Sequence, residues 1–175
     1  MAAGPMNRLR LFKDIPRYFD AWDIDACYRD MELDGVRDVQ MERKAEGLEA
    51  VLKVCGKIGN SSFTQTISLA AGQERLEFHT RIHWQELHRL LKTAFPVEVH
   101  AETARNEIQF GFVERPAHRS REYDKDRFEV CNHRYTALCD EAHGAAVLND
   151  GKYGISMEGN SLELTREFPS ILIPY

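Results

Sequence analysis

Residues 49–84 read EAVLKVCGKIGNSSFTQTISLAAGQERLEFHTRIHW, and apolar and polar side chains alternate through almost all of them. Side chains two residues apart share one face of a strand, so this alternation gives each strand one apolar face for the core and one polar face for solvent. The pattern is interrupted at Gly59-Asn60 and at Ala71-Gly72-Gln73, which are typical turn residues. The sequence therefore predicts three strands joined by short turns, which form an antiparallel meander.

The same two-residue period extends beyond this region. It begins near Val36, and residues 108–112 alternate in the same way. Residues 86–93 fit either a helical turn or a strand that is buried on both faces, and Pro96 favours a sheet edge or a bulge. Nine to eleven short strands with almost no convincing helix predict an all-β fold, most simply an antiparallel β-sandwich.

A second informative region is residues 128–154, FEVCNHRYTALCDEAHGAAVLNDGKYG. Its apolar runs, 135–139 and 145–148, lie on either side of the turn-like sequence DEAHG. The region ends in Asn149-Asp150-Gly151-Lys152-Tyr153-Gly154, and Asp-Gly between apolar runs is a strong hairpin signal. We predict a hairpin tip here, which is either an ordinary turn or part of a binding site.

Composition limits the classes of function. The chain has 175 residues, of which 43% are hydrophobic and 29% are charged, as in a globular protein with one sizeable core. A net charge of −5 and a pI near 5.8 argue against nucleic acid as a partner. No apolar run approaches the roughly 20 residues that span a bilayer, so no membrane partner is expected.

The four cysteines do not form a recognisable metal or disulfide pattern. They occupy positions 27, 55, 131 and 139 without a CxxC pair. We interpret them as buried free thiols in a reducing cytoplasm. His79 and His83 would lie about 13 Å apart on a strand at roughly 3.3 Å per residue, too far for one zinc ion.

Residues 14–25, DIPRYFDAWDID, mix aromatic rings with carboxylates. This mixture suits sugar recognition, in which rings stack on C–H faces and carboxylates bind hydroxyls. Packing of the rings onto the domain is the commoner outcome and is favoured here. Asp20, Asp23 and Asp150 could also be combined into a carboxylate pair for glycoside hydrolysis, but so acidic a sequence offers dozens of such pairs. The sequence carries no GxSxG, HExxH, P-loop or GxGxxG motif.

Five strings together resemble a known family. In chain order they are DIPRYFDAWDID, TRIHWQELHRLLKTAFPVEVHAE, EIQFGFVERPAHR, RFEVCNHRYTALCDE and LNDGKYGISMEGNSLEL. They resemble the C-terminal β-domain of family-38 glycoside hydrolases, the α-mannosidases, and are most similar to the cytosolic and bacterial type. The resemblance covers nearly all of residues 11–165. It implies a sandwich similar to the supersandwich of galactose-mutarotase-like domains.

The resemblance also implies which domain of the parent enzyme carries out catalysis. In that family the zinc ion, its ligands and the nucleophile of the retaining mechanism belong to an N-terminal catalytic domain. We find no equivalent before residue 11, so this chain alone is predicted to be inactive and to hold no cofactor. The expected partners are that catalytic domain and, in the full enzyme, an α-mannoside, and the expected location is cytoplasmic.

The resemblance assigns no catalytic residue and no metal ligand to this chain, but it suggests residues at the rim of the sugar pocket. The leading candidates for the rim are Asp150, Lys152 and Tyr153, in the turn that starts at Asn149. The remaining candidates face either the pocket or a neighbouring domain, and they are Asp20, Trp22, Asp23, Glu107, Arg115, His133 and Arg134.

Residues 1–10 are interpreted as a leader or entry segment, and residues 11–175 as a single β-sandwich domain of a larger enzyme. After Leu164 the sequence REFPSILIPY departs from the family pattern, so we expect the domain to be incomplete at its C-terminal end. Bare sheet edges would then favour self-association. Two alternatives stay open, a free-standing carbohydrate-binding module and a small hydrolase that uses its own acids. The module requires measurable binding of mannose or mannobiose, whereas a domain of a larger enzyme predicts little.

Overall fold

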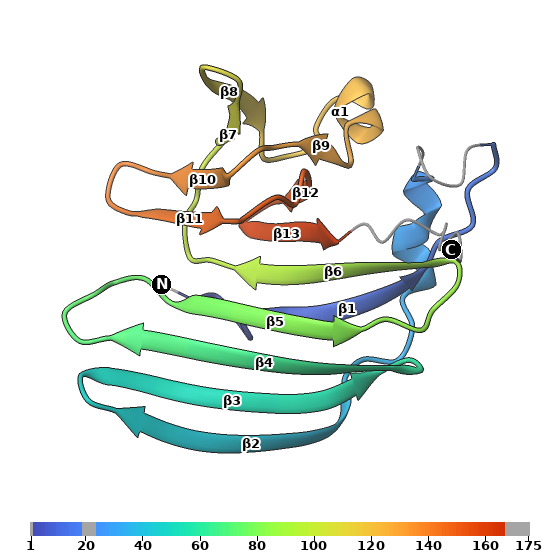
Figure 1. Cartoon of the computed structure of the whole chain (residues 1–175). Coiled ribbons are helices and arrows are strands. Elements are labelled where there is room, and N and C mark those ends of the chain that lie inside the picture. The colour runs from blue at the N-terminus through green and yellow to red at the C-terminus, as the bar shows by residue number, and fades with distance from the viewer. Residues whose placement is uncertain (1, 19–23, 167–175) are drawn as a thin grey trace. The chain divides into compact units, whose positions relative to one another are not determined.

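The structure is a computed structural model that describes residues 2–18 and 24–166 (Figure 1). It divides into two compact units, one formed by Met1–Glu32 with Arg89–Tyr175 and the other by Leu33–His88.

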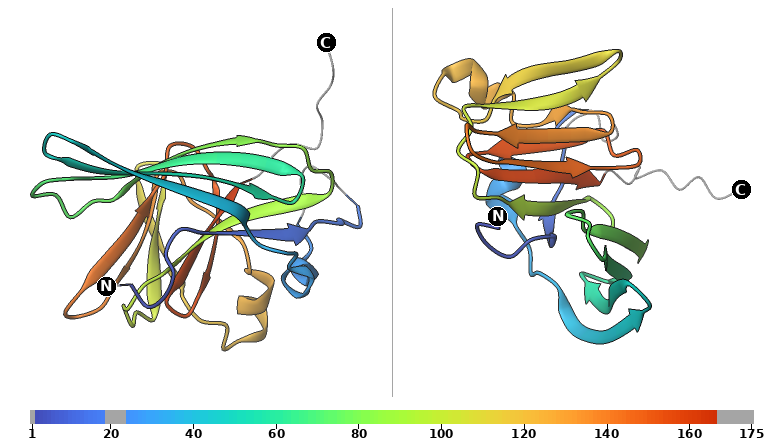
Figure 2. Two further views of the ribbon diagram at one scale, coloured as in Figure 1. Left: turned by 90° about the horizontal axis from the view of Figure 1, so that it is seen from below. Right: turned by 90° about the vertical axis from the view of Figure 1, so that its left-hand side faces the viewer.

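The unit Leu33–His88 contains the predicted three-stranded meander, preceded by a fourth strand that was not counted in it. Strands β2 (Arg37–Glu46), β3 (Glu49–Ile58), β4 (Ser61–Ala70) and β5 (Glu77–His83) pair antiparallel in chain order, and the hairpins can be followed from cyan to green in Figures 1 and 2. The register confirms the alternation, because Leu52 lies opposite Ile67 and Lys53 opposite Thr66. The first predicted turn has Gly59 at φ +58°, a conformation that favours glycine.

The larger unit contains two antiparallel sheets. One has the order β1 (Arg8–Lys13), β6 (Arg89–Pro96), β13 (Ser161–Arg166), β12 (Gly154–Glu158) and β9 (Val130–Cys131). The other has the order β11 (Gly144–Leu148), β10 (Tyr135–Cys139), β7 (Thr103–Ile108) and β8 (Gly111–Pro116).

Alternate residues of β7 and β10 point into the core of this unit. Ala104, Asn106 and Leu138 are fully buried. Asn106 Nδ2 donates to Thr136 Oγ1 at 2.8 Å and lies 3.6 Å from Met157 Sδ on β12, so the two sheets pack against each other. The predicted antiparallel β-sandwich is confirmed within this unit.

Strand β6 resolves the ambiguous run. Residues 90–95 are all buried, because the strand lies between β1 and β13 and is covered on both faces. The alternative of a strand buried on both faces is therefore correct. The expected edge position for Pro96 is wrong, since it is paired with Ser161 at the end of a central strand. A strand terminus also tolerates a residue without an N–H.

Two short helices were not predicted. The 3₁₀ helix η1 (Ala26–Met31) places Tyr28 in the core, where its ring centroid is 5.2 Å from that of Phe12 and 6.2 Å from that of Phe128. Helix α1 (Glu122–Asp126) lies between β8 and β9 in chain order. Both Figure 1 and Figure 2 place α1 beside the β7–β8 hairpin at one end of the unit. Neither helix, nor any other in the described ranges, has the length and hydropathy to cross a membrane.

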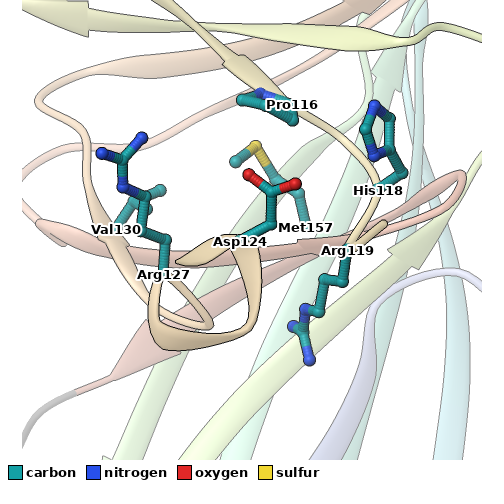
Figure 3. Close-up of a pocket in the computed structure, with 7 residues that line it drawn as sticks. All are labelled: Pro116, His118, Arg119, Asp124, Arg127, Val130 and Met157. Carbon is teal, nitrogen blue, oxygen red and sulfur yellow. The ribbon is translucent and has the colours of Figure 1, made fainter. Parts of the chain in front are cut away.

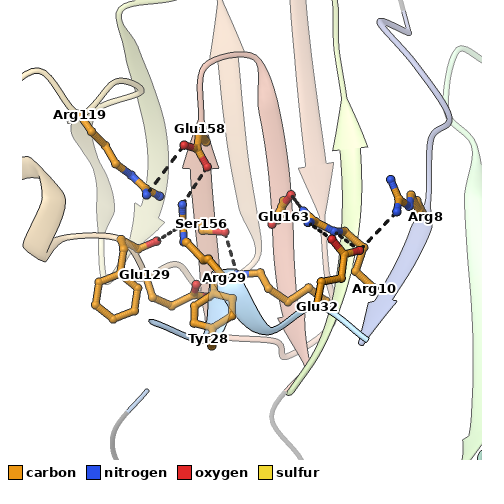
Figure 4. A network of polar contacts seen from close by, with 12 residues as sticks. Arg8, Arg10, Tyr28, Arg29, Glu32, Arg119, Glu129, Ser156, Glu158 and Glu163 are labelled. Carbon is orange, nitrogen blue, oxygen red and sulfur yellow. Dashed lines mark hydrogen bonds and ion pairs between the residues drawn. The ribbon is translucent and has the colours of Figure 1, made fainter. Parts of the chain in front are cut away.

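The polar face of the five-stranded sheet holds a network of ion pairs (Figure 4). Lys92 is fully buried, and its ammonium donates to Glu129 Oε2 at 2.6 Å, Ser156 Oγ at 2.7 Å and Tyr28 Oη at 3.1 Å. Glu129 also accepts a hydrogen bond from the Thr165 hydroxyl. The buried ammonium of Lys92 thus makes three hydrogen bonds, one of them to a carboxylate, which offsets the cost of removing it from water.

A neighbouring part of the same network holds Arg10, whose guanidinium bonds Glu32 at 2.6 Å and Glu163 at 2.5 Å. The Glu32 carboxylate accepts from Arg10, and this hydrogen bond is the main cause that raises the pKa of Arg10 and lowers the pKa of Glu32. Glu32 follows η1 directly, so the pair fixes the end of η1 to β1 and β13.

All four cysteines are free, as expected, but the prediction that they are buried is wrong. Cys27, Cys131 and Cys139 are exposed and Cys55 is half-buried. The reason is position in the sheets, since Cys131 lies on the edge strand β9 and Cys139 is the last residue of β10.

Candidate functional site

The turn after Asn149 is not a hairpin tip, contrary to the prediction. Strand β11 belongs to the four-stranded sheet and β12 to the five-stranded sheet, so residues 149–153 cross from one sheet to the other. Gly151 has φ +131°, and Asp150 does not share a positive φ, as the expected hairpin turn would require. The shape comes instead from Asn149, whose Oδ1 accepts the N–H of Gly151 at 2.9 Å and of Lys152 at 2.6 Å.

This crossing segment meets the loop that joins β9 to β10. The Asn132 N–H donates to the Tyr153 carbonyl at 2.9 Å, and the Asn149 N–H donates to the Arg134 carbonyl at 2.8 Å. The rings of His133 and Tyr153 make an edge-to-face contact with centroids 5.7 Å apart. Two segments that are separated in sequence therefore form one surface.

Glu107, near the end of β7, completes this surface. Its carbonyl accepts the His133 N–H at 3.0 Å, and its carboxylate oxygen Oε2 accepts the Arg134 N–H at 2.7 Å. The structure thus brings together predicted site residues from three separate segments. We call this set the rim cluster, and it consists of Glu107, His133, Arg134, Asn149, Asp150, Lys152 and Tyr153.

The rim cluster presents several polar side chains to solvent. Asp150, Arg134 and Tyr153 are exposed, with 61% of Tyr153 accessible, whereas His133 and Lys152 are half-buried. Burial lowers the pKa of Arg166, and the charge of Asp150 opposes this change. The carboxylate of Asp150, the ammonium of Lys152 and the phenol of Tyr153 can bind hydroxyl groups.

Arg115 is not joined to the rim cluster by any of these contacts. It lies on β8, and burial is the main cause that lowers its pKa, with a smaller contribution of the same sign from Arg127. Asp20, Trp22 and Asp23 lie outside the described residues, so the structure says nothing about their predicted role.

The cavity shown in Figure 3 lies elsewhere in the unit. Its volume is about 20 Å³, and the Asp124 carboxylate points into it beside Met157 and Pro116. Its lining residues are Pro116, His118, Arg119, Asp124, Arg127, Val130 and Met157, and none is a predicted site residue. A cavity of this size holds one water molecule and is too small for a sugar.

The described residues carry no group of three His, Cys, Asp or Glu side chains able to hold a metal ion. In particular, His79 and His83 both lie on strand β5, as the alternation predicted.

One prediction concerns the shape of the rim. The substitution Asn149→Ala removes the acceptor of two backbone N–H groups in a half-buried turn, so it should lower the free energy of unfolding by about 1–2 kcal/mol. Urea denaturation measures this change. The control Asn149→Asp keeps the Oδ1 acceptor, so it should lose less of the free energy of unfolding than Asn149→Ala. Equal losses for the two variants would show that Oδ1 does not shape the turn.

Comparison with known proteins assigns the chain to one family of protein domains. A family model described as the glycosyl hydrolases family 38 C-terminal domain matches residues 1–166. Human Alpha-mannosidase 2C1 is 39% identical over 166 residues, which are 91% of this chain and 16% of the relative. Alpha-mannosidase G of Dictyostelium discoideum is 34% identical over 91% of this chain and 15% of its own length. The chain therefore spans about one sixth of the length of these relatives.

A solved structure gives the same fold. The crystal structure of an alpha-mannosidase from Enterococcus faecalis V583 superposes with a TM-score of 0.74 over 92% of this chain and 22% of that protein. The two sequences share 12% identity, so this likeness concerns the fold alone.

Proposed function

Because this chain belongs to the family of glycosyl hydrolase family 38 C-terminal domains, we propose that it acts as the β-domain of an α-mannosidase. In this proposal it supports a catalytic part of the same polypeptide and contributes the rim cluster to the edge of the sugar pocket. The observation that carries the proposal is the convergence of Glu107, His133 and Tyr153 from three segments. The same segments carry the family resemblance in the sequence.

The catalytic part would supply the chemistry. We expect zinc to be held there, and no residue of this chain is proposed as a ligand. The chain's own residues would orient sugar hydroxyls. Asp150 would accept from hydroxyl groups, Lys152 would donate to them, and Tyr153 can do both. Asn149 and Glu107 hold the backbone that presents these side chains, through bonds of 2.6–2.9 Å.

The test uses an α-mannosidase polypeptide that carries this domain. Removing a hydrogen bond to a substrate hydroxyl usually costs 1–3 kcal/mol, so Asp150→Asn and Lys152→Met should lower kcat/KM for an α-mannoside by about 10- to 100-fold with zinc content unchanged. The matched controls Asp126→Asn and Lys125→Met, on exposed positions of α1, should leave kcat/KM unchanged. Rim variants with unaltered kcat/KM would refute a role of the rim in sugar binding. The 175-residue chain alone should not hydrolyse a nitrophenyl α-mannoside, even with zinc added.

Two further parts of the proposal follow from the sequence. One is a cytoplasmic location. The other is self-association through a bare sheet edge, for which β11 is the best candidate because it is an edge strand, GAAVL, without a charged or proline residue. A constant monomer mass in light scattering over a wide range of concentrations would exclude self-association.

A further inference from the structure

The outer face of the four-stranded sheet carries a row of aromatic and apolar side chains that the sequence analysis did not single out. The register places Tyr135 opposite Leu148 and Glu107 opposite Phe112. In the β10–β7 pairing Thr136 lies opposite Asn106, and extending this register by one residue pair places Tyr135 opposite Glu107. Residues directly opposite each other share a face, so Leu148, Tyr135, Glu107 and Phe112 form one row across the sheet.

This row is open to solvent at both ends. The side chain of Leu148 is 66% exposed and that of Phe112 is 50% exposed. The tip of the β7–β8 hairpin adds Phe110, which is fully exposed and has φ +63°. A bulky residue with positive φ is uncommon and costs free energy, so the hairpin holds this ring in water by a strained backbone.

Charged groups lie among these apolar side chains. The Arg105 guanidinium lies over the Phe112 ring at 5.2 Å from its centroid and pairs with Glu114 at 3.1 Å, and both charged side chains are about half-exposed. The Glu107 carboxylate is held by the Arg134 N–H, so it is fixed beside Phe112 in the row. An exposed ring flanked by fixed carboxylates and a guanidinium is unlike the centre of a protein interface, where charged residues are depleted.

We propose that this row, with Phe110 at the hairpin tip, is a surface binding site for α-linked mannosyl sugars. We call it the aromatic platform, made of Phe110, Phe112, Tyr135 and Leu148 with Arg105, Glu107 and Glu114. The apolar side chains pack against the C–H face of a sugar ring. The charged groups bind its hydroxyls, as carboxylates accept and guanidinium groups donate.

The platform adjoins the rim cluster, because Glu107 belongs to both and Leu148 directly precedes Asn149. It would hold a sugar unit outside the pocket. The proposed function contributes only the choice of mannosides over other sugars. Binding at the platform needs no catalytic part, so it is a property of this chain alone, in contrast to the expectation from the sequence that such a domain binds little sugar.

The experiment is an NMR titration of the ¹⁵N-labelled 175-residue chain with an α-linked mannobiose. We expect saturable shifts of the amides at 105–114 and 135. The substitution Phe112→Ala should weaken binding at least 5-fold, while the amide spectrum stays dispersed as in the folded parent. The matched control is Tyr123→Ala, which removes a 47%-exposed ring from α1 and should leave binding unchanged.

Three outcomes would overturn the platform. They are no saturable shift with mannobiose, equal binding by Phe112→Ala and the parent chain, and shifts of the same amides on raising protein concentration without sugar. The last would identify the surface as an interface between copies. Each outcome leaves the rim proposal untouched, because that proposal is tested by kcat/KM of the full enzyme at Asp150 and Lys152. If the Asp150 and Lys152 variants kept the kcat/KM of the parent enzyme, the mannobiose titration would still test the aromatic platform.

Discussion

Replacing Lys92 with alanine is expected to lower the free energy of unfolding by about 3–5 kcal/mol. The Lys92 side chain is fully buried, and its ammonium is 2.6 Å from the carboxylate of Glu129, whose side chain is only 12% exposed. Removing the cation leaves this carboxylate in the interior without a counter-charge, and the hydroxyls of Tyr28 and Ser156 lose a donor. Such an uncompensated buried charge is among the costliest single changes in a protein. The shift of the urea midpoint, at unchanged m-value, measures the loss.

Two variants control for this result. Lys125→Ala breaks an exposed pair with Glu122 at 3.0 Å and should change stability by no more than about 0.5 kcal/mol. The double variant Lys92→Met with Glu129→Gln removes both charges and should recover a part of the loss. A Lys92→Ala chain within 1 kcal/mol of the parent would mean that water reaches Glu129 and that the pair contributes little.

Replacing Phe12 with alanine should cost about 3–5 kcal/mol, the usual range for a buried phenylalanine. The Phe12 ring is 1% exposed and packs edge-to-face against Tyr28, in a cluster with Leu90. The cavity left by the ring would open beneath η1, since Tyr28 is the residue that anchors this helix. Thermal and urea unfolding both report the loss.

The same substitution at an exposed ring is the control for Phe12. Phe110→Ala removes a fully exposed side chain from the β7–β8 tip and should stay within about 0.5 kcal/mol of the parent chain. If the two alanine variants were equally stable, Phe12 could not be part of the packed core described above. A stable Phe110→Ala chain would also be usable in the sugar titration.

The clearest sequence signals were those that repeat every second residue. Alternation predicts the pairing of β3 with β4, because a strand with one buried face tolerates a single register. The observed pairs are Leu52 with Ile67 and Lys53 with Thr66. The same reasoning failed at Asp150-Gly151, where local turn chemistry suggested a hairpin. The chain crosses between sheets there, because the next strand finds its partners in Cys131 and Thr165 rather than in β11.

The rim cluster could be predicted only in part. The sequence named Glu107, His133 and Tyr153 through a family resemblance, but nothing local to any of them indicates that they meet. The burial of Lys92 was also unpredictable, because its partners Tyr28, Glu129 and Ser156 are 64, 37 and 64 residues away. Lysine is usually exposed, and only those distant partners make its burial tolerable.

The sequence by itself determined the all-β class, the meander of residues 49–83 and the membership of the family, since each depends on local periodicity or on the order of short strings. The tertiary structure alone decided which strands share a sheet, that residues 149–153 cross between sheets, and that Phe112 stands beside Glu107. The physical reason is the distance along the chain between the residues that interact. Alternation fixes which face of a strand is dry, but the choice of neighbouring strand depends on burial and hydrogen bonds between residues far apart in the chain.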